Sequence, residues 1–105
     1  MTRLFSVYGD SISSFEGILP QGWRVFFEGE QLELTGVKTP HDTWWGQVIE
    51  HFDGQFLANA SWSGCVVEGR DFPVGASAER IEHLQADGRT PDDILVHIGI
   101  NDYGW

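Results

Sequence analysis

Three short apolar runs along the chain predict three buried β-strands. They cover residues 4–8, 55–60 and 93–98. Each run is rich in β-branched, aromatic or small apolar residues and stops at glycine or at small polar residues that favour turns. The middle run does not alternate between apolar and polar positions, so we expect that strand to be buried on both faces, as strands of parallel sheets are.

The segment 39–54 has the spacing of an amphipathic helix. Either Thr39-Pro40 or Asp42-Thr43 is suited to cap its start, and Gly54 follows its end. Apolar side chains at i, i+3, i+4 and i+7 form one stripe that would face the sheet. This stripe consists of Trp45, Val48, Ile49 and Phe52.

A second, shorter helix is expected between Ser77, a suitable cap, and Gly88. Its buried face would consist of Ala78, Ile81, Leu84 and Gln85. The resulting order of strand, helix, strand, helix and strand is the βαβ pattern of a parallel sheet with right-handed crossovers. The fold class is therefore α/β, with residues 1–105 in a single domain.

The segment 23–34 contains two β-prone pieces on either side of a glycine-containing turn. We expect a hairpin-like excursion here. It would either lie over the carboxyl end of the sheet and shape a cleft, or form a solvated surface insertion.

The composition and net charge of the chain argue against some classes of partner. The 105 residues carry a formal net charge of -10 and no cluster of lysine and arginine, which argues against binding to a phosphate backbone. A single cysteine, Cys65, excludes an internal disulfide framework and is expected to be a small buried apolar residue. No apolar run approaches the ~20 residues of a membrane span and no signal-peptide pattern is present, so we expect a cytoplasmic location.

Each predicted strand ends in residues that can carry chemistry. The first breaks into Gly9-Asp10-Ser11, the second leads to Gly64, and the third breaks into Gly99-Ile100-Asn101-Asp102. Ligands of open α/β sheets bind outside the carboxyl ends of the strands, which makes Ser11 a candidate nucleophile. Gly-Asp-Ser is also ordinary turn chemistry, and Asp10 and Asp102 are expected to support their turns through hydrogen bonds to local amides.

With these three blocks in this order, the sequence resembles the SGNH (GDSL-type) hydrolase family. The resemblance implies a flavodoxin-like, three-layer parallel sheet of strand order 2-1-3-4-5, of which about three of five strands are present here. It implies that Ser11 is the catalytic nucleophile. The oxyanion-hole donors would be the backbone N–H of Ser11, the backbone N–H of Gly64 and the side-chain amide of Asn101.

The family's Asp-x-x-His block, which supplies the general base, is absent. Of the four histidines, His41 is the least unfavourable substitute, because the start of its helix could face the site. His51 and His83 belong to helices, and His97 should be buried about 13 Å from the site, at ~3.3 Å per strand residue. We therefore expect a truncated hydrolase that is inactive alone, or one completed by a homodimer or a second chain at the exposed edge of the third strand.

The function predicted from these features is a serine esterase that hydrolyses small acyl or acetyl esters, without cofactor or metal. No Gly-x-Gly-x-x-Gly, Walker-type or His-Glu-x-x-His pattern is present. Trp44, Trp62 and Trp105 could stack on an acetylated sugar or pack in the core. The alternative is a non-enzymatic, flavodoxin-like module that binds a small anion or partner without turnover.

Overall fold

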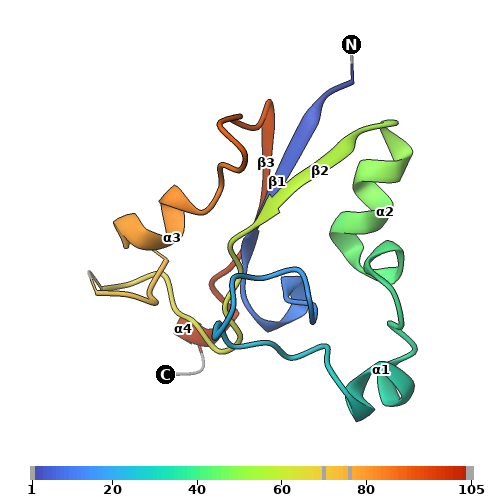
Figure 1. The fold of residues 1–105 in the computed structure, drawn as a ribbon. Helices are drawn as coiled ribbons and strands as arrows, with labels where there is room; N and C mark the ends of the chain where they lie inside the picture. The colour runs from blue at the N-terminus through green and yellow to red at the C-terminus, as the bar shows by residue number, and fades with distance from the viewer. Residues whose placement is uncertain (1, 70, 76, 104–105) are drawn as a thin grey trace.

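The computed structural model describes residues 2–69, 71–75 and 77–103, and Figure 1 shows their arrangement. Three strands form one sheet, and α-helices and short 3₁₀ helices connect them. The elements in chain order are β1 (Leu4–Gly9), η1 (Ser11–Ser13), α1 (Glu30–Thr35), η2 (Pro40–Asp42), α2 (Trp44–His51), β2 (Gln55–Asn59), α3 (Ala78–Glu82), β3 (Asp93–His97) and α4 (Ile100–Tyr103).

The sheet is parallel and its strand order is β2-β1-β3. The first strand of the chain is thus the central one: Leu4 pairs with Gln55 on one side, and Gly9 pairs with His97 on the other. The α/β prediction is confirmed, and so are the positions of the three strands to within a residue or two. Because all strands run the same way, their carboxyl ends lie at one edge of the sheet.

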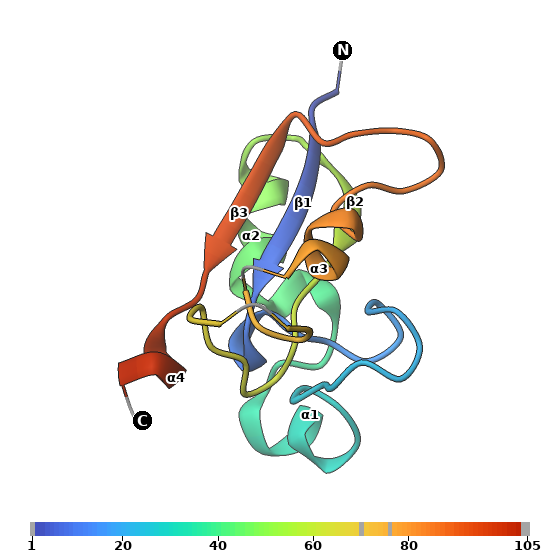
Figure 2. The ribbon, with the colours of Figure 1, turned by 90° about the vertical axis from the view of Figure 1, so that its left-hand side faces the viewer.

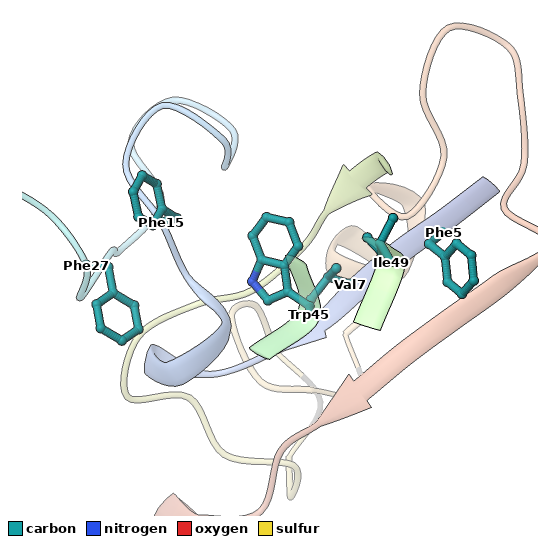
Figure 3. Close-up of a cluster of buried hydrophobic side chains, with 6 residues drawn as sticks. All are labelled: Phe5, Val7, Phe15, Phe27, Trp45 and Ile49. Atoms are coloured by element: carbon teal, nitrogen blue, oxygen red, sulfur yellow. The ribbon is translucent and has the colours of Figure 1, made fainter. Parts of the chain in front are cut away.

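Helices α2 and α3 lie on opposite sides of the sheet, so the molecule has three layers (Figure 1). Successive strand residues point to opposite faces, and β1 is therefore buried on both. The larger core, drawn in Figure 3, joins β1 and α2 to the segment between η1 and α1, and it consists of Phe5, Val7, Phe15, Phe27, Trp45 and Ile49. A smaller cluster contains Tyr8, Ala60 and Leu84.

Helix α2 begins with two capping arrangements, at both of the predicted positions. Thr39 and Asp42 form a capping box around η2, and the Thr43 side chain then accepts a hydrogen bond from Gly46 N (3.0 Å) at the start of α2. Trp45 and Ile49 of the predicted stripe are buried, whereas Phe52 lies beyond the helix end and is 62% exposed. The stripe is therefore shorter than predicted.

The hairpin expected over 23–34 is wrong. In the described chain this segment has no strand, and α1 begins at Glu30. Glutamate, glutamine and leucine are good helix formers, and Gly36 ends the helix in the left-handed conformation (φ 80°), which glycine adopts without strain. Within this short helix Leu32 packs against the core, whereas Glu33 and Leu34 are exposed.

The predicted buried face of the second helix is right for Leu84 and wrong for Ala78, Ile81 and Gln85, which are exposed. Helix α3 ends at Glu82, Ile81 is 51% exposed, and the buried side chains are Arg80 and Leu84. Ser77 stands at the helix start, but its side chain makes no capping hydrogen bond.

The middle strand of the sequence, β2, was expected to be buried on both faces. It is instead an edge strand, in which only Leu57 and Asn59 are buried. Because β1 occupies the centre of the sheet, β2 has a neighbour on one side only, which leaves part of its surface exposed.

Strand β3 forms the other edge of the sheet, and Figure 2 shows it without a neighbour on its outer side. Two of its apolar side chains are exposed, Ile94 to 46% and Val96 to 60%. An edge of this kind presents unpaired backbone groups as well as apolar side chains.

We predict that Ile49→Ala lowers the free energy of unfolding by about 2–5 kcal/mol, because it leaves a cavity between α2 and β1. The matched control is Leu34→Ala, at a position that is 76% exposed, with an expected change within about 0.5 kcal/mol. Urea unfolding measures both. Equal effects of the two substitutions would contradict the assignment of the core.

Candidate active site

Three polar segments follow the carboxyl ends of the three strands. Helix η1, which begins at Ser11, follows β1; the loop that contains Gly64 follows β2; and α4, which contains Asn101, follows β3. Because the three strands are parallel, the predicted site residues that follow them lie at the same edge of the sheet.

Ser11 is the first residue of η1, and the turn before it is held by Asp10. The Asp10 side chain is fully buried, and its Oδ1 accepts a hydrogen bond from Ile12 N (3.2 Å). Ser11 itself is partly exposed, and its carbonyl accepts hydrogen bonds from the backbone N–H (3.2 Å) and the hydroxyl (2.7 Å) of Ser14. The backbone of the turn is therefore fixed while Ser11 remains accessible.

Ser13 anchors the other end of η1 through hydrogen bonds that were not predicted from the sequence. Its carbonyl accepts hydrogen bonds from Trp45 Nε1 and Asn59 Nδ2, both at 2.9 Å, and its Oγ accepts one from Trp44 Nε1 at 2.9 Å. Asn59 also accepts a bond from Ser61 N (2.9 Å) and so ties η1 to the end of β2. Asn59, a polar residue within an apolar strand, was the signal in the sequence for these bonds, because a buried amide needs hydrogen-bond partners.

The loop after β2 lies against the end of β1. Trp62 N donates to the carbonyl of Gly9 (3.1 Å), and Cys65 Sγ lies 3.5 Å from the same oxygen. Gly64 is exposed and has a φ of 86°, which a residue with a Cβ rarely adopts. The glycine therefore allows the loop to turn here without backbone strain.

Asn101 and Asp102 hold this loop from the side of β3. Asn101 Nδ2 donates to the carbonyl of Cys65 (2.8 Å), which leaves the second N–H of the amide as a donor. Asp102 accepts hydrogen bonds from Val67 N (2.9 Å) and Glu68 N (3.1 Å), so it supports the neighbouring loop in addition to its own turn. These amides lower the pKa of the Asp102 carboxyl.

The structure brings Gly64, Asn101 and Asp102 together directly. Gly64 and Asp102 line one hollow of about 560 Å³, whose other lining residues are Val66 and Glu68. Ser11 is connected to this group through Gly9, two residues earlier, whose carbonyl receives the loop. Because the three strands are parallel, Ser11, Gly64 and Asn101 follow strand ends at the same edge of the sheet.

Cys65 is buried, as expected, and burial raises the pKa of its thiol. The nearby Arg80 guanidinium acts in the opposite direction but does not outweigh burial. A thiol with a raised pKa is protonated at neutral pH and is a poor nucleophile. Cys65 therefore serves as a structural neighbour of Gly64.

His97 lies closer to the strand ends than predicted. It was expected to be buried and about 13 Å from the site, at ~3.3 Å per residue of a strand that continued to Asn101. Instead, β3 ends at His97, which is paired with Gly9 and exposed, and the chain turns at Gly99 (φ 125°). The centroid of the His97 ring lies 5.7 Å from the centroid of the Trp44 ring.

The other three histidines are exposed and lie within helices or directly after one. His41 is in η2, His51 ends α2, and His83 follows α3 with its ring 4.9 Å from that of Trp23. In the described ranges, no histidine forms a hydrogen bond with Ser11.

Two of the three tryptophans proposed to stack on sugars already contact other rings. The centroid of the Trp62 ring lies 5.8 Å from that of Trp23 and 5.0 Å from that of Phe72. Trp44 contacts His97, as described above. Trp105 lies outside the described residues. Both described indoles are partly exposed, so each combines packing with an accessible edge.

The residues that the structure describes contain no group of three or more histidine, cysteine, aspartate or glutamate side chains placed to hold a metal ion. None of their helices has the length and apolar character needed to cross a bilayer. The cytoplasmic location stays a prediction.

Comparisons with known proteins agree with this geometry. A family model described as GDSL-like Lipase/Acylhydrolase matches residues 3–105. The fold is similar to a crystal structure described as a "putative GDSL-like lipase" from Bacteroides ovatus ATCC 8483, with a TM-score of 0.73 and 25% sequence identity. That similarity covers 97% of this chain and 50% of the other, so the chain spans half the length of the structure it matches. Among curated proteins no match is found.

The Asp102 contacts predict a pH dependence. Because the folded-state pKa of Asp102 is lowered, its stabilising effect is fully present above the ordinary aspartate pKa of about 3.9 and is lost as the pH falls through the folded value. We expect Asp102→Asn to show a smaller loss of Tm between pH 7 and pH 3 than the parent protein. The exposed Asp71→Asn is the control and should follow the parent. Parallel curves for Asp102→Asn and the parent would refute this role.

Proposed function

Because the chain belongs to the GDSL-like lipase/acylhydrolase family, we propose that it is a serine esterase, or the part of one that carries the nucleophile and the oxyanion donors. The observation that carries this proposal is the position of Ser11 at the carboxyl end of the central strand, where the Gly64 loop is bonded to the same strand end through Gly9. The substrate class is a small acyl or acetyl ester.

In the proposed reaction, Ser11 Oγ forms a bond with the acyl carbon while its proton passes to a general base. The carbon–oxygen bond to the alcohol then breaks, and the alcohol leaves with a proton. The proton on the alcohol is the one that the base took from Ser11. Water then attacks the acyl carbon and gives a proton to the base, and the base passes this proton to Ser11 Oγ as the acyl–oxygen bond breaks and the carboxylic acid is released. The backbone N–H groups of Ser11 and Gly64 and the free amide hydrogen of Asn101 would stabilise the oxyanion of each tetrahedral intermediate.

The general base is proposed to be a histidine outside this 105-residue sequence, in a longer protein or on a partner chain. The positions of the four histidines described above support this proposal, because none is bonded to Ser11 in the described chain. The matched structure, of which this chain covers half, supports it as well. The 105-residue chain alone would then be a weak catalyst, because serine needs a base for activation.

A non-enzymatic module that binds a small anion or partner at the same edge is the alternative. It would use the same N–H donors without activating Ser11. Reactivity of Ser11 therefore separates the two functions.

We predict that a fluorophosphonate probe modifies Ser11 in the form of the protein that hydrolyses p-nitrophenyl acetate. Ser11→Ala should abolish the mass adduct and lower kcat by about 10³-fold or more. Ser63→Ala, in the same loop as Gly64, is the control and should retain both. Intact mass spectrometry and steady-state kinetics provide the readouts, and full activity of Ser11→Ala would exclude Ser11 as the nucleophile.

We also propose that the exposed edge of β3 receives a further strand, from a second copy or from a completing chain. The predicted result is self-association of the 105-residue chain in sedimentation experiments at increasing concentration, weakened at least tenfold by Val96→Glu. Leu34→Glu, on α1, should not change it. A folded chain that stays monomeric at high concentration rules out the second copy and leaves the completing chain.

A further inference from the structure

Arg80 is the largest of the fully buried side chains, with an exposed fraction of 0%. In the part of the chain that the structure describes, no carboxylate forms a salt bridge with it. A buried charge is costly unless hydrogen bonds replace its lost hydration. The position of Arg80 therefore depends on the groups that accept its N–H bonds.

Three backbone carbonyls accept these bonds. Nη2 donates to Gly9 O and to Ala60 O, both at 2.7 Å, and Nε also donates to Ala60 O at 3.0 Å. Nη1 donates to Pro73 O at 2.9 Å. Four of the five N–H groups of the guanidinium are thus used, and its carbon lies 4.5 Å from the centre of the Tyr8 ring.

These carbonyls belong to the segments that carry the proposed oxyanion donors. Gly9 precedes Ser11 by two residues, and Ala60 precedes Gly64 by four. Arg80 therefore connects the turn of the nucleophile to the start of the Gly64 loop, and through Pro73 it also holds the end of that loop.

An apolar side chain of similar size would fill the same volume without the cost of desolvation. It would not, however, hold two strand ends at a fixed separation. Among the described residues, the Ala60 carbonyl has no other donor than Arg80, and the planar fork of the guanidinium fixes the direction of each bond.

We propose that Arg80 is a positioning residue that sets the separation between the backbone N–H groups of Ser11 and Gly64. This inference rests on the esterase function proposed above. Because both N–H groups act on the charge that develops in the transition state, their displacement changes kcat more than KM. The positive charge of Arg80, whose guanidinium is bonded to the carbonyls of Gly9 and Ala60, would also stabilise the negative charge of the transition state, so its loss should lower kcat as well.

The test uses Arg80→Met and Arg80→Lys in the form of the protein that hydrolyses p-nitrophenyl acetate. Arg80→Met, which has no donor and no charge, should lower kcat by about 10- to 100-fold with KM within twofold of the parent. Arg80→Lys keeps the charge but not the fork, and should recover part of this loss. The rate of fluorophosphonate labelling of Ser11 should follow kcat.

Ile49→Ala is the control for lost stability, since Ile49 belongs to the core between α2 and the sheet. Its Tm should fall while its kcat stays within twofold of the parent at a temperature where it is folded. A kcat of Arg80→Met within twofold of the parent, with the protein folded, overturns the proposal. Where Arg80→Met does not fold, Arg80→Lys decides: a lower kcat at unchanged KM supports positioning, and an unchanged kcat refutes it.

Failure of the esterase proposal would be seen separately, in the parent protein. Absence of a Ser11 adduct in the parent, or full activity of Ser11→Ala, removes the proposed nucleophile whatever the Arg80 variants do. A parent that labels at Ser11 and an Arg80→Met variant that labels at the same rate remove only the role of Arg80.

Discussion

The carbonyl group of Gly9 at the end of β1 is the point on which the arrangement of the site depends. It receives hydrogen bonds from Trp62 N and from Arg80 Nη2, and Cys65 Sγ lies 3.5 Å away. Once β1 ends, this buried oxygen has no further strand to pair with, and leaving it without a donor would cost free energy. The groups that satisfy it come from the loop after β2 and from α3, so both are fixed against the strand that leads to Ser11.

A second constraint acts on the opposite side of the same glycine. A Cβ at Gly9 would overlap the side chain of Ser13 and the carbonyl of His97. The absence of a side chain allows η1 to fold back against the strand end, where Ser13 meets Trp45 and Asn59. The turn that carries Ser11 is thus held by the α2 layer as well as by the loop, through packing and hydrogen bonds.

Local signals in the sequence were sufficient for the strands and for α2 with its two caps, whereas the strand order was implied by the family resemblance. They failed where long-range contacts decide. Helix α1 was mistaken for strand because alternating Leu32 to Leu34 outweighed helix propensity, and Arg80 was missed because a cation breaks the apolar pattern of a buried face. The carbonyls that make its burial favourable converge only after folding. The predicted site positions lie at the strand ends, but the bonds that connect them, through Gly9, Asn59 and Arg80, join residues far apart in the sequence.

The central position of β1 has a consequence for biosynthesis. This strand is translated first, yet one of its neighbours begins at Gln55 and the other at Asp93. At the rates of ribosomal synthesis, β1 waits on the order of ten seconds before both sides are paired. During that time Phe5 and Val7, which are buried in the finished fold, are exposed on a nascent chain. Transiently exposed apolar surface of this kind favours aggregation during folding.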